Sequence, residues 1–196
     1  MDNRVDEPVP KYNYINPEEY LALERISPTK NEYFDGEIFA MSGASYHHNI
    51  IFSNLFGLLA ISLKGKPSFP FGSHFRVHVR ENGLYTYPDI SIVCQDAEII
   101  DDEYKDNLLN PSVLIEILSK STRDYDKGRK FFLYKSIPTL REYILIDSLN
   151  ILVKIFRRNE DNSWTLTEYT KDSNTFNILT IDLTVRINDV YEKLKF

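Results

Sequence analysis

Two acidic residues, Asp89 and Glu116, lie in segments that are otherwise apolar. Asp89 directly precedes the run Ile90-Ser91-Ile92-Val93, and Glu116 interrupts the apolar run 112–118. Because an unpaired buried carboxylate is costly, each acid needs a proton, several hydrogen-bond donors or a cation. Either acid alone would be well explained as a strand cap or as the partner of a lysine. If the two predicted strands are neighbours in a sheet, both carboxylates can converge on one Mg²⁺. The backbone carbonyl of Ile117 would then be a third ligand of the oxygen type that this cation prefers.

A metal site that cleaves phosphodiesters also needs a cationic side chain to hold the attacking water and offset charge. Two residues after Glu116 the chain has Leu118, so no lysine stands there. The next predicted helix offers Lys127 and Lys130, which are three residues apart and therefore on overlapping faces. Either lysine could reach back to the end of the strand, or both could be surface charges near the C-terminus of that helix.

The elements that must position these residues follow from periodicity, capping and turn residues. Asn16-Pro17 begins a helix that ends near residue 26, Asp35-Gly36 supplies the turn of a hairpin over 32–41, and Ser45 caps a helix that runs to about residue 63. Ser121-Thr122 caps another helix over 123–135. Strands are predicted at 75–80, 88–94, 112–118, 142–147, 152–157, 164–169 and 176–185, with a short closing helix at 188–194. This order predicts an α/β (α+β) fold with a mixed sheet flanked by helices, formed by a single domain over 16–196 after an N-terminal tail over 1–15.

Composition narrows the class of protein. The 196 residues are 42% hydrophobic and carry a net charge of −6, with a single cysteine, Cys94. We therefore expect a globular protein without an intrachain disulfide. No apolar stretch is long enough for a membrane span and none near the start resembles a signal peptide, so we expect a cytoplasmic protein with no membrane partner.

The charge is unevenly distributed, and several common sites are disfavoured. The stretches 64–80 and 120–135 are basic, although the chain as a whole is acidic. A nucleic acid could therefore meet a basic surface locally, or these residues could form an ordinary mixed surface. Four histidines and one cysteine make an unconvincing zinc set, and without a glycine-rich phosphate loop we expect no nucleotide cofactor.

Several motifs, taken together, resemble the Uma-type restriction endonuclease family of bacteria, which belongs to the PD-(D/E)XK nuclease superfamily. The similarity covers roughly residues 15–185. The motifs are Glu32-Tyr33-Phe34-Asp35-Gly36-Glu37, Met41-Ser42, His48 with Leu55, Tyr87-Pro88-Asp89 with the strand after it, Glu116-Ile117-Leu118-Ser119-Lys120-Ser121-Thr122, Tyr125-Asp126-Lys127-Gly128-Arg129-Lys130, Tyr134, and Arg141-Glu142-Tyr143-Ile144-Leu145-Ile146-Asp147.

The resemblance implies a restriction-endonuclease-like core with additional strands, and Mg²⁺-dependent cleavage of DNA, with Mn²⁺ able to substitute. In that scheme Asp89, Glu116 and the Ile117 carbonyl bind the metal. Lys130, favoured over Lys127 by the spacing from Gly128, takes the place of the missing lysine. Glu32 resembles an additional N-terminal acid of these nucleases, or is an exposed hairpin residue. His48 matches a family position that could lie near the cleft, or is a polar residue at the start of a helix.

The sequence is compatible with three hypotheses. The first is a metal-dependent endonuclease that acts on DNA as a homodimer, since cutting both strands usually needs two sites. The second is a nucleic-acid-binding or accessory module with the same fold and weak or no catalysis. The third is an unrelated α/β domain whose strand acids are structural.

Overall fold

The largest sheet of the molecule has six strands and contains most of the predicted ones. The computed structural model describes residues 14–120 and 123–196. In spatial order the sheet contains β11 (Trp164–Thr170), β10 (Leu152–Arg158), β9 (Glu142–Asp147), β8 (Val113–Leu118), β6 (Ile90–Val93) and β3 (Phe69–Gly72). Only β8 and β9 pair in parallel, so the predicted mixed sheet is confirmed. The sequence did not predict β3, an edge strand whose Pro70 weakens the strand signal.

A second sheet lies beside the first and begins with the predicted N-terminal hairpin. Its spatial order is β2 (Glu37–Ala40), β1 (Asn31–Phe34), β5 (Leu84–Thr86), β4 (Arg76–Val79) and β7 (Asn107–Leu108). The hairpin turn uses positive φ angles at Asp35 and Gly36, as the Asp-Gly pair predicted. Only residues 87–89 separate β5 from β6, so the segment that contains Asp89 joins the two sheets.

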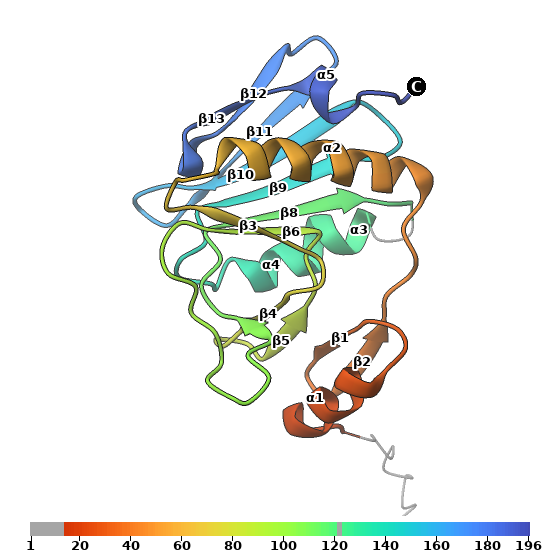
Figure 1. The fold of residues 1–196 in the computed structure, drawn as a ribbon, viewed down its shortest axis with the longest axis vertical. Helices are drawn as coiled ribbons and strands as arrows, with labels where there is room; N and C mark the ends of the chain where they lie inside the picture. The colour runs from red at the N-terminus through yellow and green to blue at the C-terminus, as the bar shows by residue number, and fades with distance from the viewer. Residues whose placement is uncertain (1–13, 121–122) are drawn as a thin grey trace, which may run out of the picture.

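Helices cover both faces of the six-stranded sheet. Helix α1 (Pro17–Ile26) begins with a capping box between Asn16 and Glu19, and α2 (Tyr46–Ser62) is capped by Ser45. Figure 1 shows α2 along one side of the sheet and the segment labelled α3 and α4 along the other.

The predicted helix over 123–135 is interrupted. It consists of α3 (Arg123–Tyr125), a π-helical turn over Asp126–Lys130 and α4 (Phe131–Tyr134). Its predicted caps, Ser121 and Thr122, lie outside the described residues.

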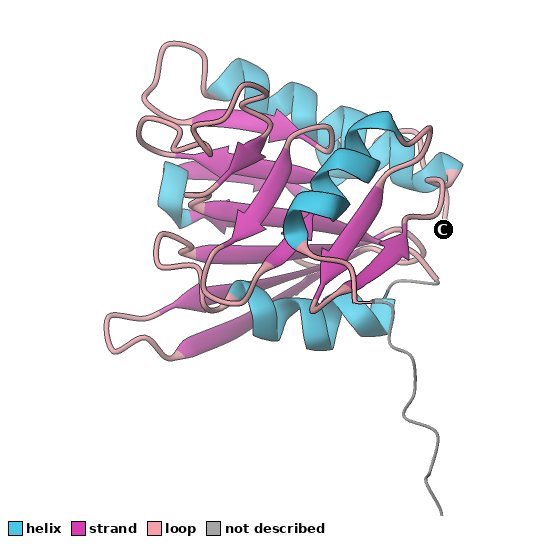
Figure 2. Ribbon diagram, turned by 90° about the horizontal axis from the view of Figure 1, so that it is seen from below, coloured by secondary structure: helices cyan, strands magenta, loops and turns pink. Residues whose placement is uncertain are grey.

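The alternation of side chains along β8 assigns each of its residues to one of two cores. Val113, Ile115 and Ile117 pack with the apolar stripe of α2, which includes Leu55. Leu114 and Leu118 pack instead with α4. Because successive strand residues point to opposite faces, Glu116 points toward the α4 side. Figure 2 shows the strands with helices above and below them.

The C-terminal region differs from the sequence prediction. The single strand expected over 176–185 is a hairpin of β12 (Thr175–Ile178) and β13 (Leu183–Arg186). A 3₁₀ turn over Leu179–Ile181 and the left-handed Asp182 reverse the chain between them. The closing helix predicted over 188–194 is the shorter α5 (Ile187–Val190). Among the helices of the described residues, none has the length and apolar character needed to cross a bilayer.

The stability of the sheet should depend on the buried stripe of α2. We expect Leu55→Ala to lower the free energy of unfolding by about 2–5 kcal/mol, because Leu55 is 0% exposed and its loss leaves a cavity against the sheet. Ile61→Ala on the same helix is the matched control, since Ile61 is 79% exposed and should change stability by less than about 0.5 kcal/mol. Urea unfolding followed by fluorescence would measure both, and equal losses would contradict this packing.

Candidate active site

One buried lysine binds three carboxylates where the two sheets meet. Lys130 Nζ lies 2.8 Å from Glu32 Oε1, 2.9 Å from Glu116 Oε1 and 3.7 Å from Asp126 Oδ1. Lys130 is 3% exposed and all three acids are buried as well. The ammonium group therefore balances negative charge that would otherwise be very costly at this position.

The residues of this cluster come from three separate elements. Glu32 comes from β1 of the hairpin and Glu116 from the α4-facing side of β8. Asp126 and Lys130 are the first and last residues of the π-helical turn. Tyr143 of β9 donates a hydrogen bond to the Asp126 carbonyl oxygen at 3.1 Å, so this backbone carbonyl within the irregular turn has a hydrogen-bond donor. Such π-helical turns inside α-helices often mark functional sites.

Two hydroxyl groups hold the carboxylates in place. The Tyr134 hydroxyl donates to Glu116 Oε1 at 3.0 Å, and Thr86 Oγ1 donates to Glu32 Oε1 at 2.5 Å. The two hydroxyl oxygens are 3.3 Å apart, and both residues are 0% exposed. Each hydroxyl thus fixes the orientation of one carboxylate, Tyr134 that of Glu116 and Thr86 that of Glu32.

Asp89 lies at the edge of the same site, beside Glu116. In the antiparallel pair of β6 and β8, Ile90 is opposite Ile115, which places Asp89 opposite Glu116. Asp89 Oδ2 accepts a hydrogen bond from the Ile117 backbone N–H at 2.7 Å. His48 Nε2 lies 3.1 Å from the same carboxylate, at the start of α2. The predicted convergence of the two strand acids therefore has a geometric basis.

The acids also influence each other electrostatically. Burial raises the pKa of Glu116 to about 8, and the negative charges of Asp126 and Asp89 raise it while Lys130 lowers it. Burial alone would lower the pKa of Lys130, but Glu116, Tyr134, Glu32 and Asp126 together raise it well above its usual value. The site thus has a charged lysine and more carboxylate than that lysine can neutralise.

The donor set is suited to a hard divalent cation. Asp89 and Glu116 offer carboxylate oxygens, and in a strand the Ile117 carbonyl points to the same edge as its N–H, which faces Asp89. Ser91 Oγ, on the same face as Asp89, is buried without a hydrogen-bond partner within the described part of the chain. No group of three or more His, Cys, Asp or Glu side chains among the described residues is arranged to hold a metal. Mg²⁺ does not need such a group, because it is commonly bound by one or two carboxylates and completes its shell with water.

The structure brings most of the predicted site residues together. Glu32, Glu116 and Lys130 are in direct contact, and His48 contacts Asp89. Lys127 is apart from them, half-buried and without an ion pair to any described residue. Glu32 is buried and ion-paired, so its alternative interpretation as an exposed hairpin residue is wrong.

Sequence reasoning missed three members of the site. Around Thr86 and Tyr134 the pattern of apolar residues indicates only packing in the protein core. Asp126 lies in the first turn of the helix predicted over 123–135, where acids are usually exposed, but it is 4% exposed and belongs to the lysine cluster. The spacing of Asp126 and Lys130, four residues apart, is the signal that could have identified this pair.

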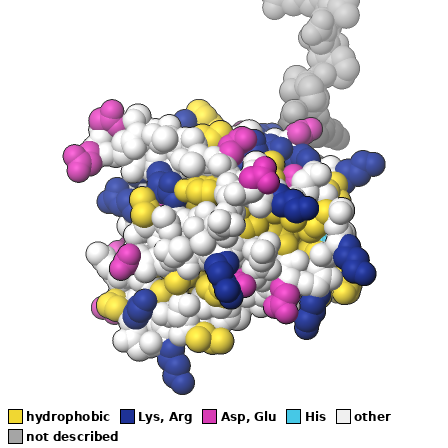
Figure 3. All heavy atoms as spheres, turned by 90° about the horizontal axis from the view of Figure 1, so that it is seen from above, with side chains coloured by type: hydrophobic (Ala, Val, Ile, Leu, Met, Phe, Trp, Pro, Cys, Tyr) yellow, Lys and Arg dark blue, Asp and Glu magenta, His cyan; other side chains and the backbone are white. Residues whose placement is uncertain are grey.

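The two basic stretches of the sequence, 64–80 and 120–135, expose fewer positive charges than their composition suggests. Arg76 is buried and bonded to Tyr87, Asp106 and Asn107, and Lys130 is buried in the site. The face in Figure 3, which is Figure 1 seen from above, shows Lys and Arg side chains scattered among acidic and apolar ones.

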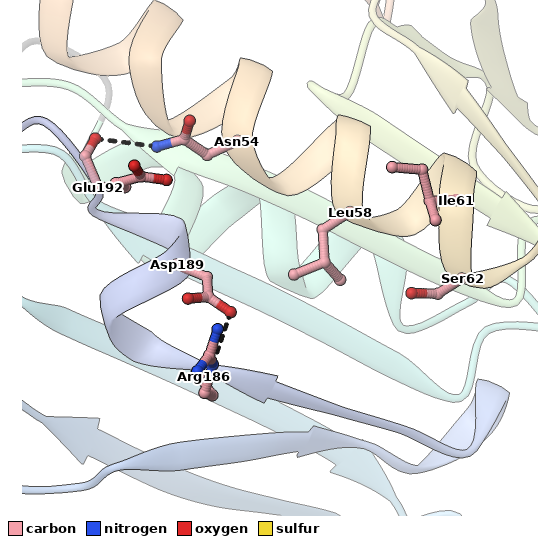
Figure 4. A pocket seen from close by; sticks show the side chains of 7 residues that line it. All are labelled: Asn54, Leu58, Ile61, Ser62, Arg186, Asp189 and Glu192. Atoms are coloured by element: carbon pink, nitrogen blue, oxygen red, sulfur yellow. Dashed lines mark hydrogen bonds and ion pairs between the residues drawn. The ribbon is translucent and has the colours of Figure 1, made fainter.

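A shallow hollow of about 390 Å³ lies elsewhere, between α2 and the segment around α5. Figure 4 shows its lining, with an ion pair between Arg186 and Asp189 and a bond from Asn54 to the Glu192 backbone. None of the residues that line the hollow belongs to the lysine cluster or contacts Asp89. We therefore place the candidate chemistry at the junction of the sheets.

Comparison with known proteins gives a consistent result. Residues 17–188 match the model of the Uma2 family, described as "Putative restriction endonuclease". Two relatives from Synechocystis sp. are described as uncharacterized proteins. The first, slr1290, is 32% identical over 96% of both chains, and the second, sll1609, is 35% identical over 76% of this chain and 84% of its own. A crystal structure from Anabaena variabilis, described as "a putative nuclease belonging to DUF820", superposes with a TM-score of 0.75 at 20% identity. It covers 90% of this chain and 97% of its own.

Removing the central cation should destabilise the protein strongly. We expect Lys130→Met to lower the free energy of unfolding by about 3–5 kcal/mol, because it leaves three buried carboxylates without their cation. Lys127→Met, in the same turn, should change it by less than about 0.5 kcal/mol. Adding Glu116→Gln to Lys130→Met should restore part of the loss, since the two residues are coupled. Urea denaturation would measure all three, and equal stability of the two lysine variants would contradict this role for Lys130.

Proposed function

The chain belongs to the Uma2 family, as its sequence motifs indicated, and on this premise we propose that it is a Mg²⁺-dependent endonuclease that hydrolyses DNA. The observation that supports this proposal most directly is the placement of Asp89 opposite Glu116, with buried Lys130 beside them. Two acids and a lysine at a strand edge correspond to the carboxylate and lysine site of PD-(D/E)XK nucleases.

In this proposal each residue has a distinct role. Asp89, Glu116 and the Ile117 carbonyl would hold Mg²⁺, which would supply Lewis-acid chemistry to the phosphate and to a water. Lys130 orients the attacking water beside Glu116 and stabilises the negative charge that develops during the attack. Glu32 fixes Lys130 from the side of the hairpin, and His48 holds the Asp89 carboxylate.

We also propose how the enzyme binds DNA and in which oligomeric state it acts. Exposed cations of the two basic stretches, Lys64, Lys66, Arg80, Lys120, Arg129 and Lys135, would contact the phosphate backbone with little dependence on sequence. A homodimer would supply one site for each strand, and the cytoplasm would be the compartment. Sedimentation at assay concentrations tests the dimer.

Cleavage of supercoiled plasmid is the direct test of the function. Mg²⁺ or Mn²⁺ should support nicking or linearisation, and EDTA should abolish it. Asp89→Asn and Glu116→Gln should each reduce the rate by at least about 100-fold, because each removes a metal ligand with little change of shape. Asp124→Asn, at an exposed acid of α3, is the matched control and should cut at the wild-type rate. Metal-dependent DNA binding without cleavage would favour the accessory-module hypothesis, and activity retained in both site variants would exclude this site.

Metal affinity should rise with pH. Because burial raises the pKa of Glu116 to about 8, this carboxyl is largely protonated below that pH, and the cation must displace the proton. We expect the affinity for Mn²⁺ to increase by up to about tenfold per pH unit below pH 8 and then to level off. Calorimetry at pH 6.5, 7.5 and 8.5, in buffers of different ionisation enthalpy, would measure the affinity and the proton released. Binding that is independent of pH and releases no proton would contradict a raised pKa at Glu116.

A further inference from the structure

A second lysine, Lys30, lies at the other end of the candidate site. Its Nζ donates to the Ser73 carbonyl oxygen at 2.7 Å and lies 3.2 Å from Ser73 Oγ. The same Nζ is 5.6 Å from the centre of the Tyr87 ring, two residues before Asp89. An ammonium group has three donors, and the described residues provide acceptors on Ser73 alone. The side chain is only half-buried, so its remaining donor can meet a ligand.

The hairpin directs Lys30 toward the site. The Met41 N–H donates to the Lys30 carbonyl at 3.0 Å, which extends the pairing of β1 and β2 by one residue. Side chains two residues apart share a face of a strand, so Lys30 and Glu32 point the same way. Glu32 contacts Lys130 on this face. This face of the hairpin therefore forms a wall of the site, with Lys30 at the end near Asp89.

Electrostatics agrees with this position. Burial lowers the pKa of Lys30, while the negative charges of Asp89 and Glu24 raise it. Asp89 has the larger of the two effects, although no ion pair within 4.0 Å joins the two side chains. Lys30 thus lies close enough to Asp89 for their charges to interact, but the two side chains do not form an ion pair.

Lys130 is poorly placed to contact a DNA phosphate. Its ammonium lies within 4.0 Å of the carboxylates of Glu32, Glu116 and Asp126, and it is 3% exposed. Its position beside Glu116 suits the role proposed for it toward the attacking water, but an entering phosphodiester would first meet the partly exposed edge that contains Asp89. A phosphate at that edge needs a cation that is accessible from solvent.

We propose that Lys30 contacts the DNA phosphate at this site, whereas Lys130 acts on the attacking water and on the buried carboxylates. This inference rests on the proposed function for its substrate, and adds a substrate-contacting residue from the N-terminal hairpin. Lys30 is held by Ser73 and so presents its charge at a defined place.

DNA binding without cleavage gives the first test. Fluorescence anisotropy with a labelled DNA duplex in EDTA, at increasing KCl, gives the slope of log K against log[salt]. Lys30→Met should weaken binding and reduce the slope by about one, as expected for one lost phosphate contact. Lys30→Arg keeps the charge and should retain the wild-type slope. Lys171→Met, an exposed lysine in the turn between β11 and β12, is the matched control and should also retain it.

Kinetics gives the second test. In plasmid cleavage Lys30→Met should raise KM for DNA several-fold, while the Mg²⁺ concentration for half-maximal rate stays unchanged, because no metal ligand is altered. Should Lys30→Met fail to fold, Lys30→Gln gives the same comparison, since its amide can still donate to Ser73.

The outcomes separate this inference from the proposed function. An unchanged salt slope in Lys30→Met, or a wild-type protein that binds no DNA, would overturn the role of Lys30. A wild-type enzyme that cuts plasmid while Lys30→Met keeps its slope would reject only this inference. A reduced slope in a protein that does not cut would support the phosphate contact and reject the nuclease.

Discussion

The shared ammonium of Lys130 is the interaction on which the arrangement of the site depends. Three carboxylates from three elements converge on it in a region closed to solvent. Without the lysine each of these acids would have to take up a proton or reach water, and the hairpin, β8 and the helical segment could not approach as they do. The charge of one side chain thus fixes the relative position of the two sheets at the candidate site.

A second buried cation, Arg76, holds in place the segment that precedes Asp89. The Arg76 guanidinium donates to the Tyr87 hydroxyl at 2.8 Å, and that hydroxyl donates to Glu24 Oε1 at 2.9 Å. This network links β4 to α1 through the residue that precedes Pro88. The segment that joins the two sheets is therefore anchored from both sides, by Arg76 before Asp89 and by the Ile117 N–H at Asp89 itself. Such support keeps a carboxylate oriented more narrowly than a single contact could.

The sequence predicted what local pattern determines and missed what depends on distant partners. Asp89 and Glu116 were predicted as site residues because they are acids within apolar segments. Asn16 and Ser45 were correctly predicted as helix caps. Nothing local distinguishes Tyr134 from a core aromatic residue, because its hydroxyl partners come from β5 and β8. The hairpin of β12 and β13 was interpreted as one strand because its reversal uses a 3₁₀ turn and Asp182, without glycine or proline.

The excess of carboxylate at the site agrees better with the proposed metal site than with a purely structural role. A protein selected for stability alone could replace the buried cluster with apolar side chains at little cost, since buried ion pairs rarely stabilise more than well-packed hydrophobic residues. Here Glu116 is instead held with a raised pKa beside Asp89, and Ser91 Oγ is left without a partner among the described residues. A divalent cation at this edge would relieve the repulsion between the two acids, so the feature that weakens the metal-free protein would favour binding of the metal.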